Sequence, residues 1–546
     1  MIDVKKAPFN LSEEQEKWVY EKLNSLTDKE KAGQLFCVLG TIFDKETLYK
    51  LTHEYCIGGI LFRPEPCVVI NQKYAEAESG IKLPLLKAAN LEEGGIGAIS
   101  DGTFYGTQMQ VAATDNTAYA KTFGKFCAEE GRSCGVNWTF SPVCDIDYNF
   151  RNPITNVRTF GSYPARVKKM TKAYVDTVQK YGLAACAKHF PGDGVDFRDQ
   201  HLHPTINSLS AKKWYATYGA IYKNLIDGGL LSIMVGHIKQ PAVEQDICPT
   251  LEYKDCLPAS LSKYLITGVL REKYGFNGVI TTDATIMGGY TMPMERRFAL
   301  PATINAGIDM IVFNTDFEED YSIILNAINS GEICRERLDD AVTRILALKA
   351  KVCFDKTSVV LTGKQRKVEE FADNSVTLVK NIGNILPVTS DRYPEIRLIL
   401  LGKDALGDGN SAVAVATKEL EGRGFKVTLY SRESDDMHGV KELSNQRLTL
   451  YIANEPTESN RTTVRLSWNP KHAMDAPRYI NEEPSVFLSV YNPYHLQDVP
   501  AVKVYVNAYS PTKVNIEAAI AKLAGESPFK GKSPVDAFCG LEDTRY

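Results

Sequence analysis

The chain contains the run LAACAKHFPGDGVDFRDQH at residues 183–201, in which an apolar segment passes directly into a polar loop. The uninterrupted apolar part, residues 183–187, is typical of a strand that is buried on both faces. The Pro-Gly-x-Gly sequence at residues 191–194 then ends the strand, because proline and glycine interrupt regular structure. Strands of this kind belong to parallel sheets that are covered by helices, so this stretch favours an α/β fold.

The same pattern recurs along the first two thirds of the chain, where short apolar runs alternate with longer amphipathic stretches. The predicted strands are Leu35–Leu39, Ile57–Phe62, Pro84–Ala89, Trp138–Val143, Leu183–Ala187, Leu231–Val235, Gly278–Thr282 and Met310–Phe313. Residues 116–134 and 163–181 show the periodicity of intervening helices. Eight strand–helix units of this length predict a (β/α)₈ TIM-like barrel.

A smaller second domain follows the predicted barrel. We expect a TIM-barrel catalytic domain over residues 1–352, a linker and connecting segment over 353–390, and an α/β sandwich domain over 391–546. The expected strands of the last domain are Ile396–Leu401, Val427–Tyr430, Leu448–Ile452, Val486–Val490 and Val502–Val506, and its expected helices are Ser411–Gly422 and Val514–Leu523.

Composition excludes several functional classes. The net charge of −4 gives no basic surface for nucleic acid, and no apolar run of about 18 residues could span a membrane. The N-terminus lacks the apolar segment of a secretory signal, and the 12 cysteines are scattered without a C-x-x-C pair. We therefore expect a cytoplasmic protein without metal or cofactor, and the sequence carries no signal for oligomeric state.

Polar residues follow six consecutive predicted strands of the barrel. They are Asn90, Glu92, Asp145, Lys188, His189, His237, Asp283, Asn314 and Asp316. Active sites of such barrels lie at the carboxyl ends of the strands. The pattern therefore predicts a converging site at that end.

The loop that follows the fifth strand carries Asp199 and His201. A carboxylate can orient a nearby imidazole and stabilise its protonated form, as in hydrolytic triads. Histidine suits proton transfer near neutral pH because its ordinary pKa is about 6.5. Taken alone, the Asp-x-His pattern at residues 199–201 fits solvated loop residues as well as it fits a catalytic pair, and His189 would then be a core histidine.

Several motifs, in one order along the chain, resemble those of glycoside hydrolase family 3, and in particular its bacterial β-N-acetylglucosaminidases (β-N-acetylhexosaminidases). The motifs are LTDKEKAGQL at 26–35, GGILF at 58–62, WTFSPVCD at 138–145, RTFG at 158–161, KHFPGDG at 188–194, PASLS at 258–262, GFNGVITTD at 275–283, VTLVKN at 376–381 and ILP at 385–387. The resemblance spans most of the chain and is thin beyond residue 390.

The resemblance implies a retaining mechanism in which Asp283 is the nucleophile and forms a glycosyl-enzyme. His201, paired with Asp199, would protonate the leaving oxygen and then deprotonate water. It further implies that Arg158, Lys188 and His189 bind sugar hydroxyls.

Two further residues keep alternative interpretations open. Met287 would pack at the floor of the site, or would be a plain core methionine. His237, at the end of the sixth strand, would line the pocket or be a buried structural residue.

Three positions depart from the family pattern. Asn90 and Ile96 stand where the third-strand motif D-x-E-G-G-R has acidic and basic residues, so either Asn90 or Glu92 would bind the outer hydroxyls. Asp193 replaces the second histidine of K-H-F-P-G-H-G, and Ala284 stands where a second aspartate often follows the nucleophile. The identity of the bound sugar depends on these changes.

The predicted function is a retaining glycoside hydrolase that releases terminal, non-reducing β-linked N-acetylglucosamine from chitin or peptidoglycan oligosaccharides. The alternatives within the family are a β-glucosidase and a β-N-acetylglucosaminide phosphorylase, since a neutral imidazole tolerates anionic phosphate better than a carboxylate does. A non-catalytic sugar-binding relative would be expected to lack Asp283 or His201, and both are present.

Overall fold

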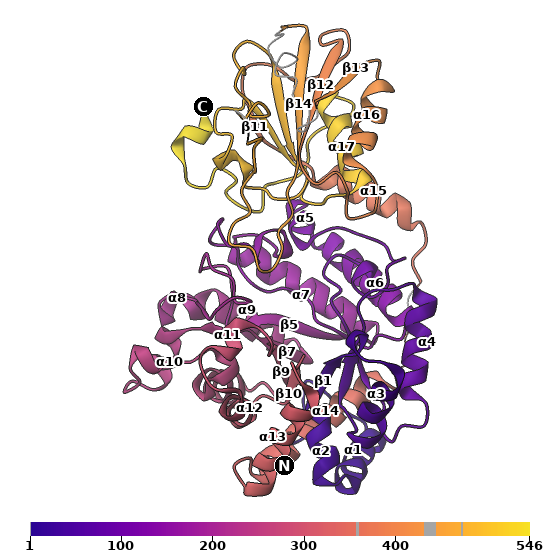
Figure 1. Cartoon of the computed structure of the whole chain (residues 1–546), viewed down its shortest axis with the longest axis vertical. Helices are drawn as coiled ribbons and strands as arrows, with labels where there is room; N and C mark the ends of the chain where they lie inside the picture. Colours follow the sequence, from indigo (N-terminus) through magenta and orange to yellow (C-terminus); the bar gives the residue numbers. More distant parts are fainter. Residues whose placement is uncertain (1, 356, 358–359, 431–443, 471–472) are drawn as a thin grey trace. The chain divides into compact units, whose positions relative to one another are not determined.

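The eight apolar runs form the strands of a closed parallel barrel (Figure 1). The computed structural model describes residues 2–355, 357, 360–430, 444–470 and 473–546. The strands follow one another around the barrel in the order β1-β10-β9-β7-β5-β4-β3-β2. Their bounds are β1 Phe36–Leu39, β2 Gly59–Leu61, β3 Leu86–Ala89, β4 Trp138–Thr139, β5 Ala184–Phe190, β7 Ser232–Val235, β9 Val279–Ala284 and β10 Met310–Val312. The barrel prediction is confirmed.

Helices lie before, between and after these strands along the chain, as the crossover connections of a parallel sheet require. They are α1 Glu13–Ser25, α2 Asp28–Gln34, α3 Lys45–Tyr49, α4 Cys67–Glu78, α5 Gln108–Ala113, α6 Thr117–Ser133, α7 Pro164–Lys180, α8 Ala211–Ala216, α9 Tyr218–Asp227, α10 Pro241–Ile247, α11 Gly288–Thr291, α12 Arg296–Asn305, α13 Phe317–Ser330 and α14 Arg335–Val352. A π-helical segment, η7, covers Tyr264–Lys273. The short strands β6 Thr205–Ile206 and β8 Ile238–Lys239 form a separate parallel pair.

A second, six-stranded sheet has the order β11-β16-β15-β14-β12-β13. Only the β11–β16 pairing is antiparallel among the described residues. The strands are β11 Thr377–Asn381, β12 Glu395–Gly402, β13 Lys426–Tyr430, β14 Arg447–Asn454, β15 Ser485–Ser489 and β16 Val504–Asn507, and the accompanying helices are α15 Lys364–Ser375, α16 Ala412–Glu421 and α17 Lys513–Leu523. This sheet confirms the predicted α/β sandwich, with β11 as a strand that the sequence did not reveal.

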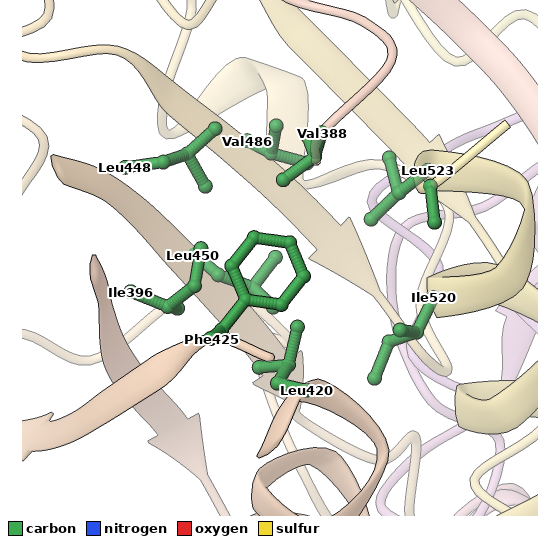
Figure 2. Close-up of a pocket in the computed structure, with 10 residues that line it drawn as sticks. Val388, Ile396, Leu420, Phe425, Leu448, Leu450, Val486, Ile520 and Leu523 are labelled. Carbon is green, nitrogen blue, oxygen red and sulfur yellow. The ribbon is translucent and has the colours of Figure 1, made fainter. Parts of the chain in front are cut away.

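Both faces of this sheet are buried, because alternate residues of its strands belong to different apolar clusters. Leu448 and Leu450 face α16 and α17, whereas Tyr451 lies in the cluster on the opposite face. Figure 2 shows Phe425 surrounded by apolar side chains from α16, α17 and the strands. The gap among them measures about 10 Å³, which is at the lower limit for one water molecule, so it is a packing gap of the core.

The contacts divide the chain into two compact units. The first comprises residues 2–103, 120–149 and 167–361, and the second comprises 104–119, 150–166 and 362–546, of which the structure describes the ranges given above. The segment predicted as linker, 353–390, contains α15 and β11. The domain limits proposed from the sequence stay predictions. Within the described part of the chain, no helix has the length and apolar character needed to cross a membrane.

An ionic cluster lies where β10 begins. Asp309 is fully buried, and its carboxylate accepts hydrogen bonds from Arg271 and Arg337, each at 2.6 Å, and from the Ile280 backbone at 2.9 Å. Arg344 lies 3.6 Å from the same carboxylate. Burial acts to raise the pKa of Asp309, but the three guanidinium groups together hold it below its ordinary value. The cluster joins η7 and α14 to the strands.

A buried lysine should make stability depend on pH in the alkaline range. Lys349 on α14 is fully buried, and its Nζ donates a 2.6 Å hydrogen bond to Gln34 Oε1. Burial lowers the pKa of Lys349 to about 8, against about 10.4 in an unfolded chain. Between these values only the unfolded chain holds the proton, so the contribution of Lys349 to the free energy of unfolding should rise by about 2 kcal/mol from pH 8 to pH 10.

Denaturant unfolding of the wild type and of Lys349→Met at pH 8 and pH 10 measures this contribution. The difference in stability between the two proteins should move in favour of the wild type as the pH rises. A difference that stays constant across this range would contradict the lowered pKa.

Candidate active site

Strand β9 carries Asp283 to the carboxyl end of the barrel. Its Oδ1 accepts a 2.8 Å hydrogen bond from the Ala284 backbone, which fixes the plane of the carboxylate. Its Oδ2 lies 3.8 Å from Nε2 of His189, which stands near the end of β5, two places away from β9 around the barrel. One oxygen is therefore anchored, while the other faces the histidine.

His189 is held in place by a carboxylate behind it. Its Nδ1 donates to Asp145 Oδ2 at 2.7 Å, and its backbone N–H donates to Asp145 Oδ1 at 3.2 Å. Asp145 follows β4 and is fully buried. This pairing orients the imidazole so that Nε2 points toward Asp283.

The surroundings keep Asp283 ionised. Burial acts to raise the pKa of this carboxyl, but neighbouring imidazoles, His189 first and His201 as well, hold it below its ordinary value. An ionised carboxylate is the form that a nucleophile requires.

Lys188 forms a second polar group with two residues after β3. Its Nζ donates to Asn90 Oδ1 at 3.0 Å and lies 2.5 Å from Glu92 Oε1. Both Lys188 and His189 are almost fully buried. The structure thus brings together four of the predicted binding residues, in two groups at the ends of β3 and β5.

Asp199 and His201 form the expected pair on the loop after β5. Nδ1 of His201 donates to Asp199 Oδ1 at 2.7 Å, and the His201 backbone N–H donates to the same oxygen at 2.8 Å. The Asp199 side chain is 1% exposed, whereas that of His201 is 29% exposed. The buried carboxylate therefore orients an accessible imidazole whose Nε2 is available for proton transfer.

His237 lies behind the nucleophile. It is fully buried, with Nδ1 2.9 Å from Ser260 Oγ and Nε2 3.0 Å from the Ala284 carbonyl oxygen. Burial lowers its pKa to about 4, which keeps the ring neutral. These contacts favour the structural alternative for His237, and its predicted place in the pocket lining stays a prediction.

The two remaining predicted residues lie in different units. Met287 is buried and precedes α11, where its backbone N–H donates to the Ala284 carbonyl oxygen at 3.1 Å. Arg158 ends the 3₁₀ turn Asn156–Arg158 in the second unit, and its Nη1 donates to the Ile154 carbonyl oxygen. Sugar binding by Arg158 stays a prediction.

Two residues of the site did not emerge as such from the sequence. Asp145 was visible as a strand-end carboxylate, but its pairing with His189 requires the neighbouring strand. Gln200 is fully buried between Asp199 and His201, and a glutamine in a loop carries no chemical signal of its own. Among the described residues, no group of three His, Cys, Asp or Glu side chains is arranged to hold a metal ion.

The chain matches the model of the glycosyl hydrolase family 3 N-terminal domain over residues 27–348. It belongs to glycoside hydrolase family 3. A relative from Cellulomonas fimi, described as a beta-N-acetylglucosaminidase/beta-glucosidase, is 39% identical over the full length of both chains. Beta-hexosaminidase A of Pseudoalteromonas piscicida is 28% identical and matches 65% of this chain and 64% of its own.

Solved structures share the fold of this chain. The beta-glucoside phosphorylase BglX is 40% identical and superimposes with a TM-score of 0.92 over 98% of this chain and 99% of its own. A family 3 beta-N-acetylglucosaminidase from Paenibacillus sp. shares the fold, with 24% identity and a TM-score of 0.79 over 95% of this chain and all of its own. Glycosidase chemistry and the two-domain fold are thus established for this chain, whereas its sugar and acceptor are not.

Proposed function

We propose that this family 3 enzyme releases terminal β-linked N-acetylglucosamine by a retaining mechanism, with Asp283 as nucleophile and the Asp199–His201 pair as acid/base. One observation carries the proposal. Asp283, at the end of β9, has a pKa below its ordinary value, and the nearby His201, which contributes to that shift, is accessible and paired with the buried Asp199. These are the two groups that a double displacement requires.

In the first step, Asp283 attacks the anomeric carbon, and the C–O bond to the leaving group breaks. His201 gives its Nε2 proton to the departing oxygen. Asp199 stabilises the imidazolium form before this transfer and fixes the tautomer throughout. The glycosyl group is then bound to Asp283 as an ester.

In the second step, neutral His201 removes a proton from water, which attacks the anomeric carbon and releases Asp283. Because imidazole is neutral after the first transfer, it adds no negative charge near the acceptor. We further propose that Lys188 and His189 donate hydrogen bonds to sugar hydroxyls, since charge-assisted donors bind them best.

The activities ascribed to several relatives support N-acetylglucosamine as the sugar. The Cellulomonas fimi relative is described as both a beta-N-acetylglucosaminidase and a beta-glucosidase, and others are described as beta-hexosaminidases. The Asp-x-His loop supports the same assignment, since family 3 glucosidases commonly draw a glutamate acid from outside the barrel.

A second candidate is transfer of the glycosyl group to inorganic phosphate. It is favoured by the imidazole acid/base, which repels a phosphate anion less than a carboxylate would. The full-length similarity to a structure described as a beta-glucoside phosphorylase points the same way. The product would be a glycosyl 1-phosphate that retains the β configuration, because two displacements occur at one carbon.

Nitrophenyl β-glycosides of N-acetylglucosamine and glucose, assayed with and without phosphate, separate these functions. We expect N-acetylglucosaminide turnover to exceed glucoside turnover, with free sugar as product. Faster turnover of the glucoside would contradict the sugar assignment. Phosphate-dependent turnover, with glycosyl phosphate detected by ³¹P NMR, would establish the phosphorylase in place of the hydrolase.

Replacing His201 by alanine should separate leaving groups by their need for a proton. We expect kcat/KM to fall on the order of 10²- to 10⁴-fold for alkyl or methylumbelliferyl glycosides. Dinitrophenolate departs without a proton, so the rate of the first step should change little for dinitrophenyl glycosides. Because the second step still needs the base, the glycosyl-enzyme should accumulate. Azide should then restore turnover and give the β-glycosyl azide, because it attacks the intermediate from the face that water normally uses.

His203→Ala provides the matched control, since His203 lies on the same loop and its Nδ1 lies 3.3 Å from the carbonyl oxygen of the adjacent Pro204. This variant should keep both the rate and the leaving-group dependence of the wild type. Equal losses for all leaving groups in His201→Ala would remove that residue from the acid/base role.

A further inference from the structure

The loop that carries Asp199 and His201 is anchored through the residue between them. Gln200 is fully buried, and its Nε2 donates to Asp193 Oδ2 at 3.3 Å. Its Oε1 accepts a 2.7 Å hydrogen bond from the His237 backbone N–H. Both ends of this amide are therefore bound to the ends of other barrel elements, one beside β5 and one after β7.

Asp193 connects this anchor to the sugar-binding side of the site. It is almost fully buried, its Oδ1 accepts from the Gly194 backbone at 2.7 Å, and its own backbone N–H donates to Asp145 Oδ1 at 2.7 Å. Asp145 in turn orients His189, as described above. A continuous series of hydrogen bonds thus runs from His189 through Asp145 and Asp193 to Gln200.

The same loop is pressed against the chain that follows the nucleophile. The backbone N–H groups of Gly288 and Gly289 donate to the carbonyl oxygens of His201 and Gln200 at 2.8 and 3.1 Å. A Cβ on Gly288 would lie 2.2 Å from the Leu202 carbonyl oxygen, and one on Gly289 would lie 2.6 Å from that of Gln200. Only glycine allows this approach, which fixes the distance between the loop and the end of β9.

We propose that Asp193 and Gln200 form a positioning pair that sets the place of His201 relative to Asp283. The inference rests on the proposed acid/base role of His201. It also assigns a task to Asp193, which stands where the resembling motif K-H-F-P-G-H-G has a histidine. The pair does not touch the reacting atoms; it acts by holding the loop on which the proton donor lies.

The polarity of the pair allows a charge-conserving exchange. Asp193→Asn places two amides together, and Gln200→Glu places two carboxylates together. Each single change therefore disfavours the hydrogen bond between residues 193 and 200. In the double variant Asp193→Asn/Gln200→Glu, the asparagine amide can donate to the new carboxylate. The remaining glutamate oxygen can still accept from His237, and the total charge is unchanged.

Kinetics with two leaving groups test the inference. We expect each single variant to lose roughly 10- to 100-fold in kcat/KM for a methylumbelliferyl glycoside, as a misplaced group does. The loss for a dinitrophenyl glycoside should be less than about threefold, because that leaving group needs no proton. The double variant should recover most of the loss, and Gln200→Met should behave like the single variants.

Three results would overturn the inference: equal losses for both leaving groups, no recovery in the double variant, or no loss in the single variants. Failure of all three single variants to fold, judged by thermal unfolding, would assign the pair to stability alone and would overturn it as well. The His201→Ala experiment separates this outcome from failure of the proposed function. If His201→Ala shows the expected leaving-group dependence and the pair variants do not, only the positioning role is lost.

Discussion

Replacing Asp283 by alanine should lower kcat for glycoside cleavage roughly 10⁴-fold or more, because the covalent route loses its nucleophile. The anchoring N–H of Ala284 and the orientation of His189 by Asp145 do not depend on this side chain, so the variant should fold and still bind sugar. A trapped glycosyl-enzyme, formed by the wild type with a slow-reacting fluorosugar and detected by mass spectrometry, should be absent from the variant.

Azide gives this prediction a stereochemical readout. In Asp283→Ala, azide can occupy the vacated place and attack an activated β-glycoside directly, which yields the α-glycosyl azide. In His201→Ala the product should be the β-glycosyl azide. Asp227→Ala, which changes an aspartate in a surface ion pair with Lys223, should leave turnover unaltered. Formation of the covalent intermediate in Asp283→Ala would remove Asp283 from its role.

Replacing Asp309 by alanine should lower the free energy of unfolding by about 3–5 kcal/mol, since it leaves buried charges without a partner. Arg271 and Arg337 would each lose a 2.6 Å hydrogen bond, and the Ile280 backbone N–H would lose its acceptor. Because the pKa of Asp309 is lowered in the fold, its contribution is present above pH 4 and is lost as the pH falls through the lowered value.

Urea denaturation of the wild type, Asp309→Ala and Asp227→Ala at pH 7 measures this loss in the free energy of unfolding. Asp227→Ala again serves as control, because an exposed lysine–aspartate pair contributes about 0–1 kcal/mol. A loss in Asp309→Ala no greater than in Asp227→Ala would show that the cluster does not hold the barrel together. At pH 3, the difference in unfolding free energy between the wild type and Asp309→Ala should be smaller than at pH 7.

The barrel was predictable because its strands are buried on both faces and therefore form uninterrupted apolar runs. Strand β4 is shorter than its run, and Pro142 three residues beyond its end cannot donate to a ladder. Strand β11 was missed for a related reason. It lies at the edge of the second sheet, its residues Lys380 and Asn381 are polar, and its pairing partner β16 lies more than a hundred residues away.

The candidate site was predictable where barrel geometry alone brings residues together. Strand-end position placed Asn90, Lys188 and Asp283 at one end of the barrel, and the structure pairs Lys188 with Asn90. Gln200 could not be found in this way, since its importance depends on contacts with His237, which follows β7, and Gly289 of α11. Residues without reactive groups gain their role only from the folded arrangement.

The division of the chain into units bears on how such a protein can change by recombination. The second unit includes residues 104–119 and 150–166, which the chain supplies from within the barrel's own sequence. Asn156, for example, donates a hydrogen bond to Asn492, 336 positions later in the chain. A single crossover near residue 361 would therefore exchange only part of that unit. A hybrid that keeps the second unit whole would need three matched segments, 104–119, 150–166 and 362–546, in place of one.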